Sequence, residues 1–465
     1  MQYKAITSSD IQYFQNLLGE RCITNESLRE DYGQDHTEDL VFIPEVVLKP
    51  ETTDEVSAIM KYCNAEGIPV TPSGARTGLS GGALPIHGGV ALSMERFNKI
   101  IAIDEKNHQV TVEPGVITQV LQDAVREVGL FYPPDPASKG SCFIGGNVSE
   151  NSGGPKAVKY GVTKDYVLNL ELVLPTGEII WTGANVLKNA TGYNLTQLLV
   201  GSEGTLGVIT KIVMRLIPHP TDDLLMLVPF FNAEKACEAV AAIFRAGITP
   251  SGLEFMERDA LLWTMQYETE SVIEVKDTHA AHLLIEVDGF DVEALMKTCE
   301  EIMLVLENFE TDEIMFAESQ AQKDQLWKLR RKVGEAVKAH SVYKEEDTVV
   351  PRYELPNLLA AVKRIGNQYG FKSVCYGHAG DGNLHVNIIK GDLSDDFWNN
   401  GLSKAISELF TEVIALGGTI SGEHGIGLVQ KQYMPLAFSE VQLNLMRSIK
   451  QVFDPNGILN PGKIF

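Results

Sequence analysis

The chain has 465 residues, which is too long for one hydrophobic core and predicts two or three domains. Its hydrophobic content of 44% and charged content of 22% are ordinary for globular proteins. The net charge of −23 argues against a surface that binds nucleic acid or an anionic membrane. An acidic substrate would therefore need a local cationic pocket.

Cysteine spacing and hydropathy indicate the compartment. The six cysteines are widely spread and form no CxxC pair, which fits reduced thiols and gives no support for a zinc finger or an iron–sulfur cluster. The first ten residues lack the apolar core of a signal peptide, and no apolar run is long enough for a spanning helix. We therefore expect a cytoplasmic protein without a transmembrane segment.

The first predicted elements form a βαβ arrangement that ends in a glycine-rich loop. Residues 46–49 and 68–71 read as strands, with a capped helix over about 53–66 between them. The loop Pro72-Ser-Gly-Ala-Arg-Thr-Gly-Leu-Ser-Gly-Gly82 follows at the carboxyl end of a strand, where α/β folds bind ligands. Its glycines expose successive backbone N–H groups, which suits a pyrophosphate. An ordinary mobile loop is the alternative.

Two more glycine-rich stretches lie among the short strands expected from about 86 to 215. Pro133-Pro-Asp-Pro-Ala-Ser138 leads into Ile144-Gly-Gly-Asn-Val-Ser-Glu-Asn-Ser-Gly-Gly154, and Gly201-Ser-Glu-Gly-Thr-Leu-Gly207 leads into a β-branched strand. Paired prolines stiffen the backbone, and glycine pairs let a ligand lie directly on it. Each stretch alone reads equally well as a turn, but the three together favour a large, extended cofactor.

A domain boundary is predicted at residues 218–222, Pro-His-Pro-Thr-Asp. Beyond it, longer helices alternate with strands, which indicates an α+β domain with an antiparallel sheet. The elements predicted there are a strand over 283–287 and helices over 233–245, 292–308, 319–340, 403–416 and 439–452.

Two glycine-rich loops near the C-terminus concentrate chemically active side chains. They are His378-Ala-Gly-Asp-Gly-Asn-Leu-His385-Val-Asn387 and Ser421-Gly-Glu423-His424-Gly-Ile-Gly427, and they hold three of the ten histidines. Any one of these histidines is more simply explained as a hydrogen-bonded core or turn residue. As a set they indicate a metal site with a base beside it.

The expected strand geometry supports this metal site. Residues 372–377 and 384–389 read as strands joined by an Asp-Gly turn, so His385 and Asn387 share one face. A tight hairpin would bring His378 back toward His385. Glu423 would complete a two-histidine, one-carboxylate set, which suits Zn²⁺, Mn²⁺ or Fe²⁺.

These motifs and their order along the chain resemble those of the vanillyl-alcohol-oxidase-type (PCMH-type) family of FAD-binding oxidoreductases. The resemblance is to the branch of glycolate oxidase flavoprotein subunits, D-lactate dehydrogenases and D-2-hydroxyglutarate dehydrogenases. It is carried by the three glycine-rich stretches, Gly-His-Ala-Gly-Asp-Gly-Asn-Leu-His at 377–385, Gly-Glu-His-Gly at 422–425 and Asn-Pro-Gly-Lys at 460–463.

The resemblance implies an α+β fold in which a two-subdomain FAD-binding domain is joined to an α+β substrate (cap) domain with an antiparallel sheet. The implied parts are an N-terminal helical extension over 1–39, the FAD-binding domain over 40–217, the substrate domain over 218–400 and a C-terminal segment over 401–465. This last segment is helical and would return to the flavin with catalytic residues.

The resemblance also implies which residues bind FAD. Some relatives attach flavin covalently through a histidine in the first glycine-rich loop, and this loop has none, so non-covalent FAD is expected. The residues implied are Pro72, Ser73, Gly74, Ala75, Arg76, Thr77, Gly78, Leu79, Ser80, Pro134, Asp135, Ser138, Gly145, Gly146, Asn147, Ser149, Gly153, Gly161, Glu203, Gly207, Val208, Ile209 and Asn460.

For the chemistry, the resemblance implies a divalent metal, with Zn²⁺ as the first choice, on His378, His385 and Glu423. A 2-hydroxy acid would chelate the metal, His424 would accept the hydroxyl proton, and hydride would pass to flavin N5. Asn387 would contact the substrate. The activity expected is that of a FAD- and metal-dependent D-2-hydroxy-acid dehydrogenase.

A basic stretch offers the cationic anchor for the substrate. Composition alone favours a solvated basic face, whereas the resemblance implies Arg330 and Lys344 as ligands of substrate carboxylates. The 2-hydroxyglutarate enzymes have a threonine where Gly334 stands, which weakens the case for that substrate and enlarges the pocket. Lys344 argues the other way, because relatives with short substrates commonly lack it. D-2-hydroxyglutarate, D-lactate, glycolate and a bulkier D-2-hydroxy acid all stay open.

Two other functions stay open as well: a non-catalytic electron-transfer subunit of a larger complex, and an oxidase that uses O₂ directly. The electron acceptor of a dehydrogenase would be a quinone, an iron–sulfur subunit or an electron-transfer flavoprotein, and it would bring the protein to the periphery of a membrane. The oligomeric state is open, with a homodimer as one state considered.

Overall fold

The computed structural model describes residues 3–37, 40–268 and 273–465 and divides into two compact units. We describe each unit by itself. The finer division predicted at residues 39/40 and 400/401 stays a prediction. Unit 1 comprises Met1–Gly153, Val162–His219 and Glu423–Phe465, and unit 2 comprises Gly154–Gly161 and Pro220–Gly422.

The first sheet of unit 1 grows from the predicted βαβ arrangement. Thr52 caps its helix by accepting a hydrogen bond from the Glu55 backbone, and Gly67 ends the helix in the left-handed conformation. The flanking strands do not pair with each other, because both pair in parallel with a third strand between them. The order is β1-β2-β4-β3, with β1 (Cys22–Ile23), β2 (Val46–Leu48), β3 (Val70–Ser73) and β4 (Val90–Ser93), and with helices α1 (Ser8–Leu18), α2 (Glu26–Arg29) and α3 (Thr53–Glu66).

A second, antiparallel sheet completes unit 1 and agrees with the two subdomains expected. Its order is β5-β6-β10-β8-β9. The strands are β5 (Ile100–Asp104), β6 (Gln109–Val112), β8 (Val167–Val173), β9 (Ile179–Trp181) and β10 (Val208–Arg215), accompanied by the short pair β7 (Leu130–Phe131) and β11 (Ile217–Pro218) and by α4 (Thr118–Arg126), α5 (Ile144–Glu150) and α7 (Leu195–Leu199).

The C-terminal residues return to the first sheet of unit 1. After α15 (Met434–Ala437) and α16 (Glu440–Phe453), Leu459 pairs with Val70 of β3 in a parallel bridge. Ile458 and Leu459 are fully buried in the same core as α1 and α3. This pairing brings the end of the chain beside the loop that follows β3.

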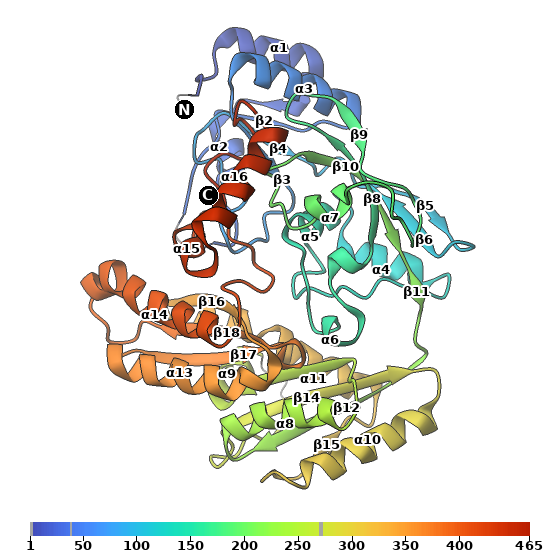
Figure 1. Cartoon of the computed structure of the whole chain (residues 1–465), viewed down its shortest axis with the longest axis vertical. Helices are drawn as coiled ribbons and strands as arrows, with labels where there is room; N and C mark the ends of the chain where they lie inside the picture. Colours follow the sequence, from blue (N-terminus) through green and yellow to red (C-terminus); the bar gives the residue numbers. More distant parts are fainter. Residues whose placement is uncertain (1–2, 38–39, 269–272) are drawn as a thin grey trace. The chain divides into compact units, whose positions relative to one another are not determined.

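Unit 2 is built on one antiparallel sheet in the order β15-β12-β14-β13-β17-β18-β16, which confirms the sheet expected there (Figure 1). Helices α9, α11 and α12 pack on the face that carries Met256 and Tyr376. The strands are β12 (Asp222–Phe230), β13 (Gly252–Glu257), β14 (Ala281–Gly289), β15 (Met315–Phe316), β16 (Tyr343–Val349), β17 (Lys372–Gly377) and β18 (Asn383–Ile389), and the helices are α6 (Ala157–Tyr160), α8 (Ala233–Arg245), α9 (Arg258–Tyr267), α10 (Val292–Leu306), α11 (Gln320–Arg331), α12 (Val333–His340), α13 (Leu355–Tyr369) and α14 (Leu402–Ala415).

One predicted helix, over 319–340, is divided in the structure. Lys332 leaves the helical conformation and separates α11 from α12. Arg330 at the end of α11 and Val333 at the start of α12 are both buried.

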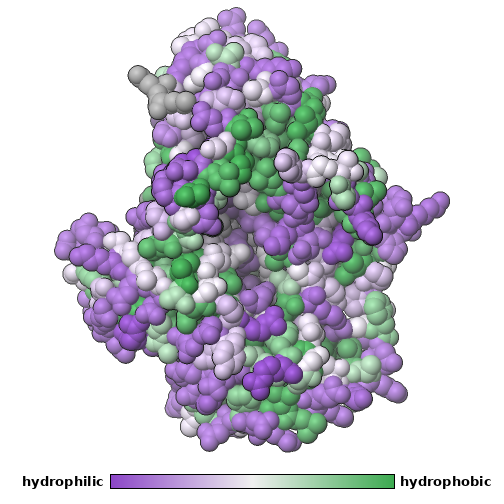
Figure 2. Space-filling view, viewed as in Figure 1, coloured by the Kyte–Doolittle hydropathy of each residue, from purple (hydrophilic) through white to green (hydrophobic). Residues whose placement is uncertain are grey.

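The surface is largely hydrophilic, with apolar residues exposed on α16. Figure 2 shows hydrophobic residues gathered where this helix lies, and Val441, Leu445 and Val452 are each more than half exposed. Leu443 is buried and attaches the helix to unit 1. In the part of the chain that the structure describes, no helix is both long and apolar enough to cross a lipid bilayer.

Candidate active site

The loop after β3 presents a run of backbone donors. Among the described residues, none accepts a hydrogen bond from a backbone N–H between Gly74 and Ser80, and the run ends where Gly81 donates to Thr37 Oγ1 at 2.6 Å. Ser73 Oγ is buried and has no hydrogen-bond partner within the described chain. The residues from Gly74 to Leu79 are partly exposed or exposed, so a ligand can reach their N–H groups, and the oxygens of a pyrophosphate would supply several acceptors. The residues of this loop therefore fit FAD.

Asn460 joins this loop to the third glycine-rich stretch. Its amide nitrogen donates to the backbone oxygens of Gly82 at 3.0 Å and Glu203 at 2.9 Å. Both loops are held by one side chain, which comes from the returning C-terminal residues. Asn460, predicted to bind FAD, is thus placed to shape the cradle.

The second glycine-rich stretch is partly helical. Residues Ile144–Glu150 form α5, and the side chains of Asn147 and Ser149 bond within unit 1, to Thr118 Oγ1 at 2.6 Å and to the Gly145 oxygen at 2.9 Å. Of the residues predicted to bind FAD, only Gly161 belongs to unit 2. The others all lie in unit 1.

The loop that carries Glu423 and His424 is fixed in unit 1 by a buried carboxylate. Glu203 accepts hydrogen bonds from the backbone N–H groups of Ile426 at 2.7 Å and Gly427 at 2.6 Å. Gly425 has a φ of +80°, and a Cβ there would collide with Glu150 and come within 3.1 Å of Glu203. Only glycine fits this position.

Glu150 and Glu203 form a buried carboxyl pair that the sequence did not reveal. Burial raises the pKa of Glu150 well above its usual value, and the neighbouring Glu203 raises it further. Two neighbouring buried carboxylates repel each other when both are ionised, so one of the pair keeps its proton. Burial also raises the pKa of Glu203, but its two backbone donors lower it, so Glu150 is the member of the pair that holds the proton more strongly.

In unit 2, the β17–β18 hairpin brings His378 and His385 together as predicted. His385 pairs across the sheet with Tyr376, and His378 follows at the end of β17. The two imidazole rings are nearly perpendicular, with their centroids 5.7 Å apart. Both residues are buried.

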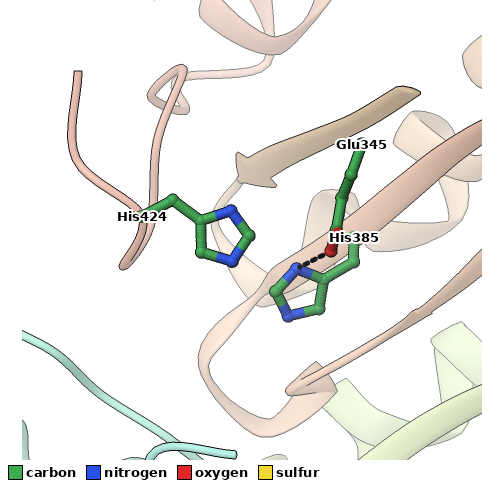
Figure 3. Close-up of side chains that lie close together, drawn as sticks. All are labelled: Glu345, His385 and His424. Atoms are coloured by element: carbon green, nitrogen blue, oxygen red, sulfur yellow. Dashed lines mark ion pairs between the residues drawn. The ribbon is translucent and has the colours of Figure 1, made fainter. Parts of the chain in front are cut away.

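Each of these histidines has a carboxylate at Nδ1. Glu254 of β13 lies 2.9 Å from His378 Nδ1, and Glu345 of β16 lies 3.1 Å from His385 Nδ1 (Figure 3). A carboxylate at Nδ1 keeps the proton on that nitrogen and leaves the lone pair on Nε2 for a metal. Neither glutamate was predicted, because both lie far from the histidines in sequence and only the sheet pairing brings them close.

Asp347 anchors the segment that precedes Glu423. Its carboxylate accepts hydrogen bonds from Gly422 N at 2.7 Å and Ser421 Oγ at 3.1 Å, and from the Asn383 amide at 2.7 Å. Asp347 lies directly opposite His385 in the β16–β18 pair. The backbone that continues into Glu423 therefore starts from a point fixed beside His385.

The three residues of unit 2 that were predicted to bind substrate, Asn387, Arg330 and Lys344, have different surroundings. Asn387 is fully buried, and neither atom of its amide has a hydrogen-bond partner in the described chain. Arg330 is also buried, with Nε 2.6 Å from Glu254 and its guanidinium 5.1 Å from the centre of the Tyr376 ring. Lys344 is exposed opposite Ile388, on the other face of the sheet from His385, so the structure does not bring it to this group.

The space beside Gly334 is occupied. A Cβ at this position would lie 3.1 Å from the Tyr376 hydroxyl. The Tyr376 hydroxyl is therefore the group that a side chain at this position would meet. The enlarged pocket expected from the sequence stays a prediction.

Comparison with known proteins identifies the family of the chain. A family model described as FAD linked oxidases, C-terminal domain, matches residues 219–464, and one described as FAD binding domain matches residues 44–183. A D-lactate dehydrogenase from Anaerostipes hadrus is 38% identical, over 100% of this chain and 98% of its own length. Glycolate oxidase subunit GlcD from Bacillus subtilis is 39% identical over 93% and 92%.

Among solved structures, p-cresol methylhydroxylase with substrate bound has a TM-score of 0.80 at 20% identity, covering 99% of this chain and 98% of that one. At this identity the likeness shows a shared fold. It extends across both units and is the fold that the sequence resemblance implied.

Proposed function

Because the chain belongs to the FAD-linked oxidases and is a FAD-linked oxidoreductase, we propose that it oxidises a D-2-hydroxy acid to the 2-oxo acid with FAD and a divalent metal. One relative is named a D-lactate dehydrogenase and another a glycolate oxidase subunit. Lactate and glycolate are both 2-hydroxy acids, so the two names share one reaction. The arrangement of His378 and His385, each with a carboxylate at Nδ1, carries the proposal.

FAD, when bound, supplies the acceptor for the hydride that leaves the substrate carbon. The residues between Ser73 and Ser80 would hold its pyrophosphate through their backbone donors, and Asn460 and Glu203 would keep the neighbouring loops in place. The first loop contains no histidine, so the binding would be non-covalent.

A divalent ion, when bound, supplies a Lewis acid that lowers the pKa of the substrate hydroxyl. His378 and His385 would hold it through Nε2, and Glu423 would be the third ligand, because it follows directly after Gly422 at the Asp347 anchor. Two imidazoles and one carboxylate suit Zn²⁺, with Mn²⁺ and Fe²⁺ as alternatives.

The chain's own groups would orient the substrate and take its proton. Asn387 has a buried amide with unused donors and an unused acceptor, which fits a ligand that completes its hydrogen bonds. Arg330 would direct its guanidinium to the substrate carboxylate while Glu254 holds it in place. His424 would accept the hydroxyl proton on a ring nitrogen, since imidazole titrates close to neutral pH. Electrons would leave the reduced protein to a quinone, an iron–sulfur subunit or an electron-transfer flavoprotein.

The test is anaerobic flavin reduction by a panel of D- and L-2-hydroxy acids, with and without a metal chelator. We expect D-acids to bleach the flavin absorbance of the purified holoenzyme, and the chelator to abolish bleaching without releasing flavin. No bleaching by any acid in the metal-loaded protein would favour an electron-transfer subunit. Stoichiometric hydrogen peroxide in air would identify an oxidase instead of a dehydrogenase.

A further inference from the structure

The carboxylate of Glu345 lies on the sheet face that carries His385. The proposed reaction does not require a carboxylate at this place. Glu345 lies directly opposite Asn387 in the β16–β18 pair, and both side chains are on the face that carries His385. Its neighbour Lys344 points to the other face. A cation was expected near this group, and the residue that occupies the place is an anion.

Two polar groups lie next to the Glu345 carboxylate. The Tyr376 hydroxyl donates to Glu345 Oε1 at 3.3 Å, and His385 Nδ1 lies 3.1 Å from the same oxygen. A carboxylate offers acceptors and no donor. Through the strand pairing, Glu345 places this group beside Asn387.

Tyr376 adds a steric limit to this charge. Its ring lies between Arg330, 5.1 Å from the ring centre, and His385, whose ring centroid is also 5.1 Å away. Its hydroxyl fills the space beside Gly334 and comes within 3.1 Å of a Cβ placed there. The position next to the arginine thus holds a rigid aromatic ring.

The basic side chains of α11, of residues 156–159 and at Lys332 have partners. Arg331 lies over the Trp327 ring. The other cations of these described residues are paired with carboxylates: Lys156 with Glu286, Lys159 with Asp288, Lys323 with Asp223, Lys328 with Glu268, Arg330 with Glu254 and Lys332 with Glu335.

We propose that Glu345 and Tyr376 select monocarboxylic 2-hydroxy acids with a small substituent at C2 and exclude acids with a second carboxylate. This inference rests on the proposed function and narrows its substrate. A like charge held next to Glu345 without a paired cation is unfavourable, and the discrimination expected from such a contact is on the order of 100-fold. The two residues act on the far end of the substrate, away from the carbon that is oxidised.

The first experiment uses the wild-type holoenzyme and three substrates. We compare kcat/KM for D-lactate, for D-2-hydroxyglutarate and for the 5-amide of D-2-hydroxyglutarate, which has the same length without the second charge. The order expected is D-lactate first, the amide second and the dicarboxylate last, with about tenfold or more between the last two. Equal values for the amide and the dicarboxylate, or a preference for the dicarboxylate, would overturn the inference.

The second experiment assigns the effect to Glu345. Glu345→Gln removes the charge and keeps the shape, so we expect the ratio of kcat/KM for D-lactate over D-2-hydroxyglutarate to fall by about tenfold. The ratio is the readout because any loss of metal through His385 affects both substrates alike. Asp347→Asn is the matched control, since Asp347 is on the same strand and face but bonds to Gly422 and Asn383. It should lower both activities and leave the ratio unchanged.

The outcomes separate the two proposals. A protein whose flavin no 2-hydroxy acid reduces would overturn the proposed function, whereas a protein that oxidises D-lactate and D-2-hydroxyglutarate equally well would overturn this inference alone. An unchanged ratio in Glu345→Gln, or an equal change in Asp347→Asn, would remove Glu345 from the selection. The wild-type comparison still decides the question if either variant fails to fold.

Discussion

Both carboxylate oxygens of Glu254 lie 2.9 Å from His378 Nδ1. The same fully buried carboxylate is 2.6 Å from Arg330 Nε, so one side chain orients a predicted metal ligand and a predicted substrate ligand together. Burial alone would raise the pKa of Glu254, but Arg330 and His378 outweigh it and hold this pKa below its usual value. Glu254 is therefore a permanent anion in the centre of unit 2.

We expect Glu254→Gln to lower metal affinity by about 10- to 100-fold, because the His378 ring would lose the partner that fixes its tautomer and orientation. The measurement is competition with a chromophoric chelator for Zn²⁺ or Mn²⁺ on the holoenzyme. Glu257→Gln is the control, since Glu257 is also buried on β13 but bonds to Lys363 and to the Cys375 backbone. Equal losses in both variants would contradict a specific role for Glu254.

We expect His424→Ala to lose turnover by about 100- to 10,000-fold while it keeps its flavin absorbance and its metal, because a general base contributes to the rate and not to cofactor binding. The measurement is anaerobic flavin reduction in a stopped-flow instrument. Added imidazole should restore part of the rate by taking the proton in place of the side chain. Unchanged turnover would reject the assignment of His424 as the base.

We expect Gly425→Ala to destabilise the protein by about 1–3 kcal/mol, because a Cβ at this left-handed position collides with the Glu150 carboxyl. Displacement of the 423–427 loop should also lower turnover more than flavin content. Chemical denaturation and flavin reduction measure the two effects. Gly140→Ala is the control, since a Cβ at Gly140 meets nothing within 4 Å and its backbone is not left-handed.

A buried histidine away from the site predicts how stability depends on pH. Burial, assisted by the neighbouring His279, lowers the pKa of His282 from 6.5 to about 3, and neither ring nitrogen has a hydrogen-bond partner in the described chain. Below pH 6.5, His282 therefore binds a proton in the unfolded chain, whereas in the folded chain it stays neutral until about pH 3. The stability present above this window is lost as the pH falls through it.

We expect the free energy of unfolding to fall less steeply with acidification in His282→Leu than in the wild type. The difference should approach about 1.4 kcal/mol per pH unit within the window. Urea denaturation of both proteins at neutral and mildly acidic pH gives the two slopes. Parallel slopes would show that His282 is not the group responsible.

Local signals in the sequence predicted much of the fold. The α8 helix was predicted with its bounds from Ala233 to Arg245, and in the structure Asn232 caps it and its apolar residues are buried. The β17–β18 hairpin followed from alternation and an Asp-Gly turn. The break at Lys332 was missed because apolar residues keep helical spacing across it, from Leu326 and Leu329 to Val333 and Val337.

In the candidate site, contacts between residues close in sequence could be predicted, and contacts between distant strands could not. His378 and His385 are close in sequence, so their approach could be predicted from the hairpin. Glu254 and Glu345 reach them through strands that pair from distant positions, and no local pattern marks either residue. Lys344 and Glu345 are adjacent, and the strand register alone decides which of them faces His385.

The chain passes between its two units four times, at Gly153/Gly154, Gly161/Val162, His219/Pro220 and Gly422/Glu423. A fragment from Pro220 to Gly422 would lack Lys156 and leave the buried Glu286 without its cation. A fragment that stops at His219 would lack Ile458 and Leu459, which lie in the core beside β3. During synthesis on the ribosome, one edge of β3 cannot pair until residues 458–460 have been made. The flavin cradle is therefore among the last parts of the protein to be completed.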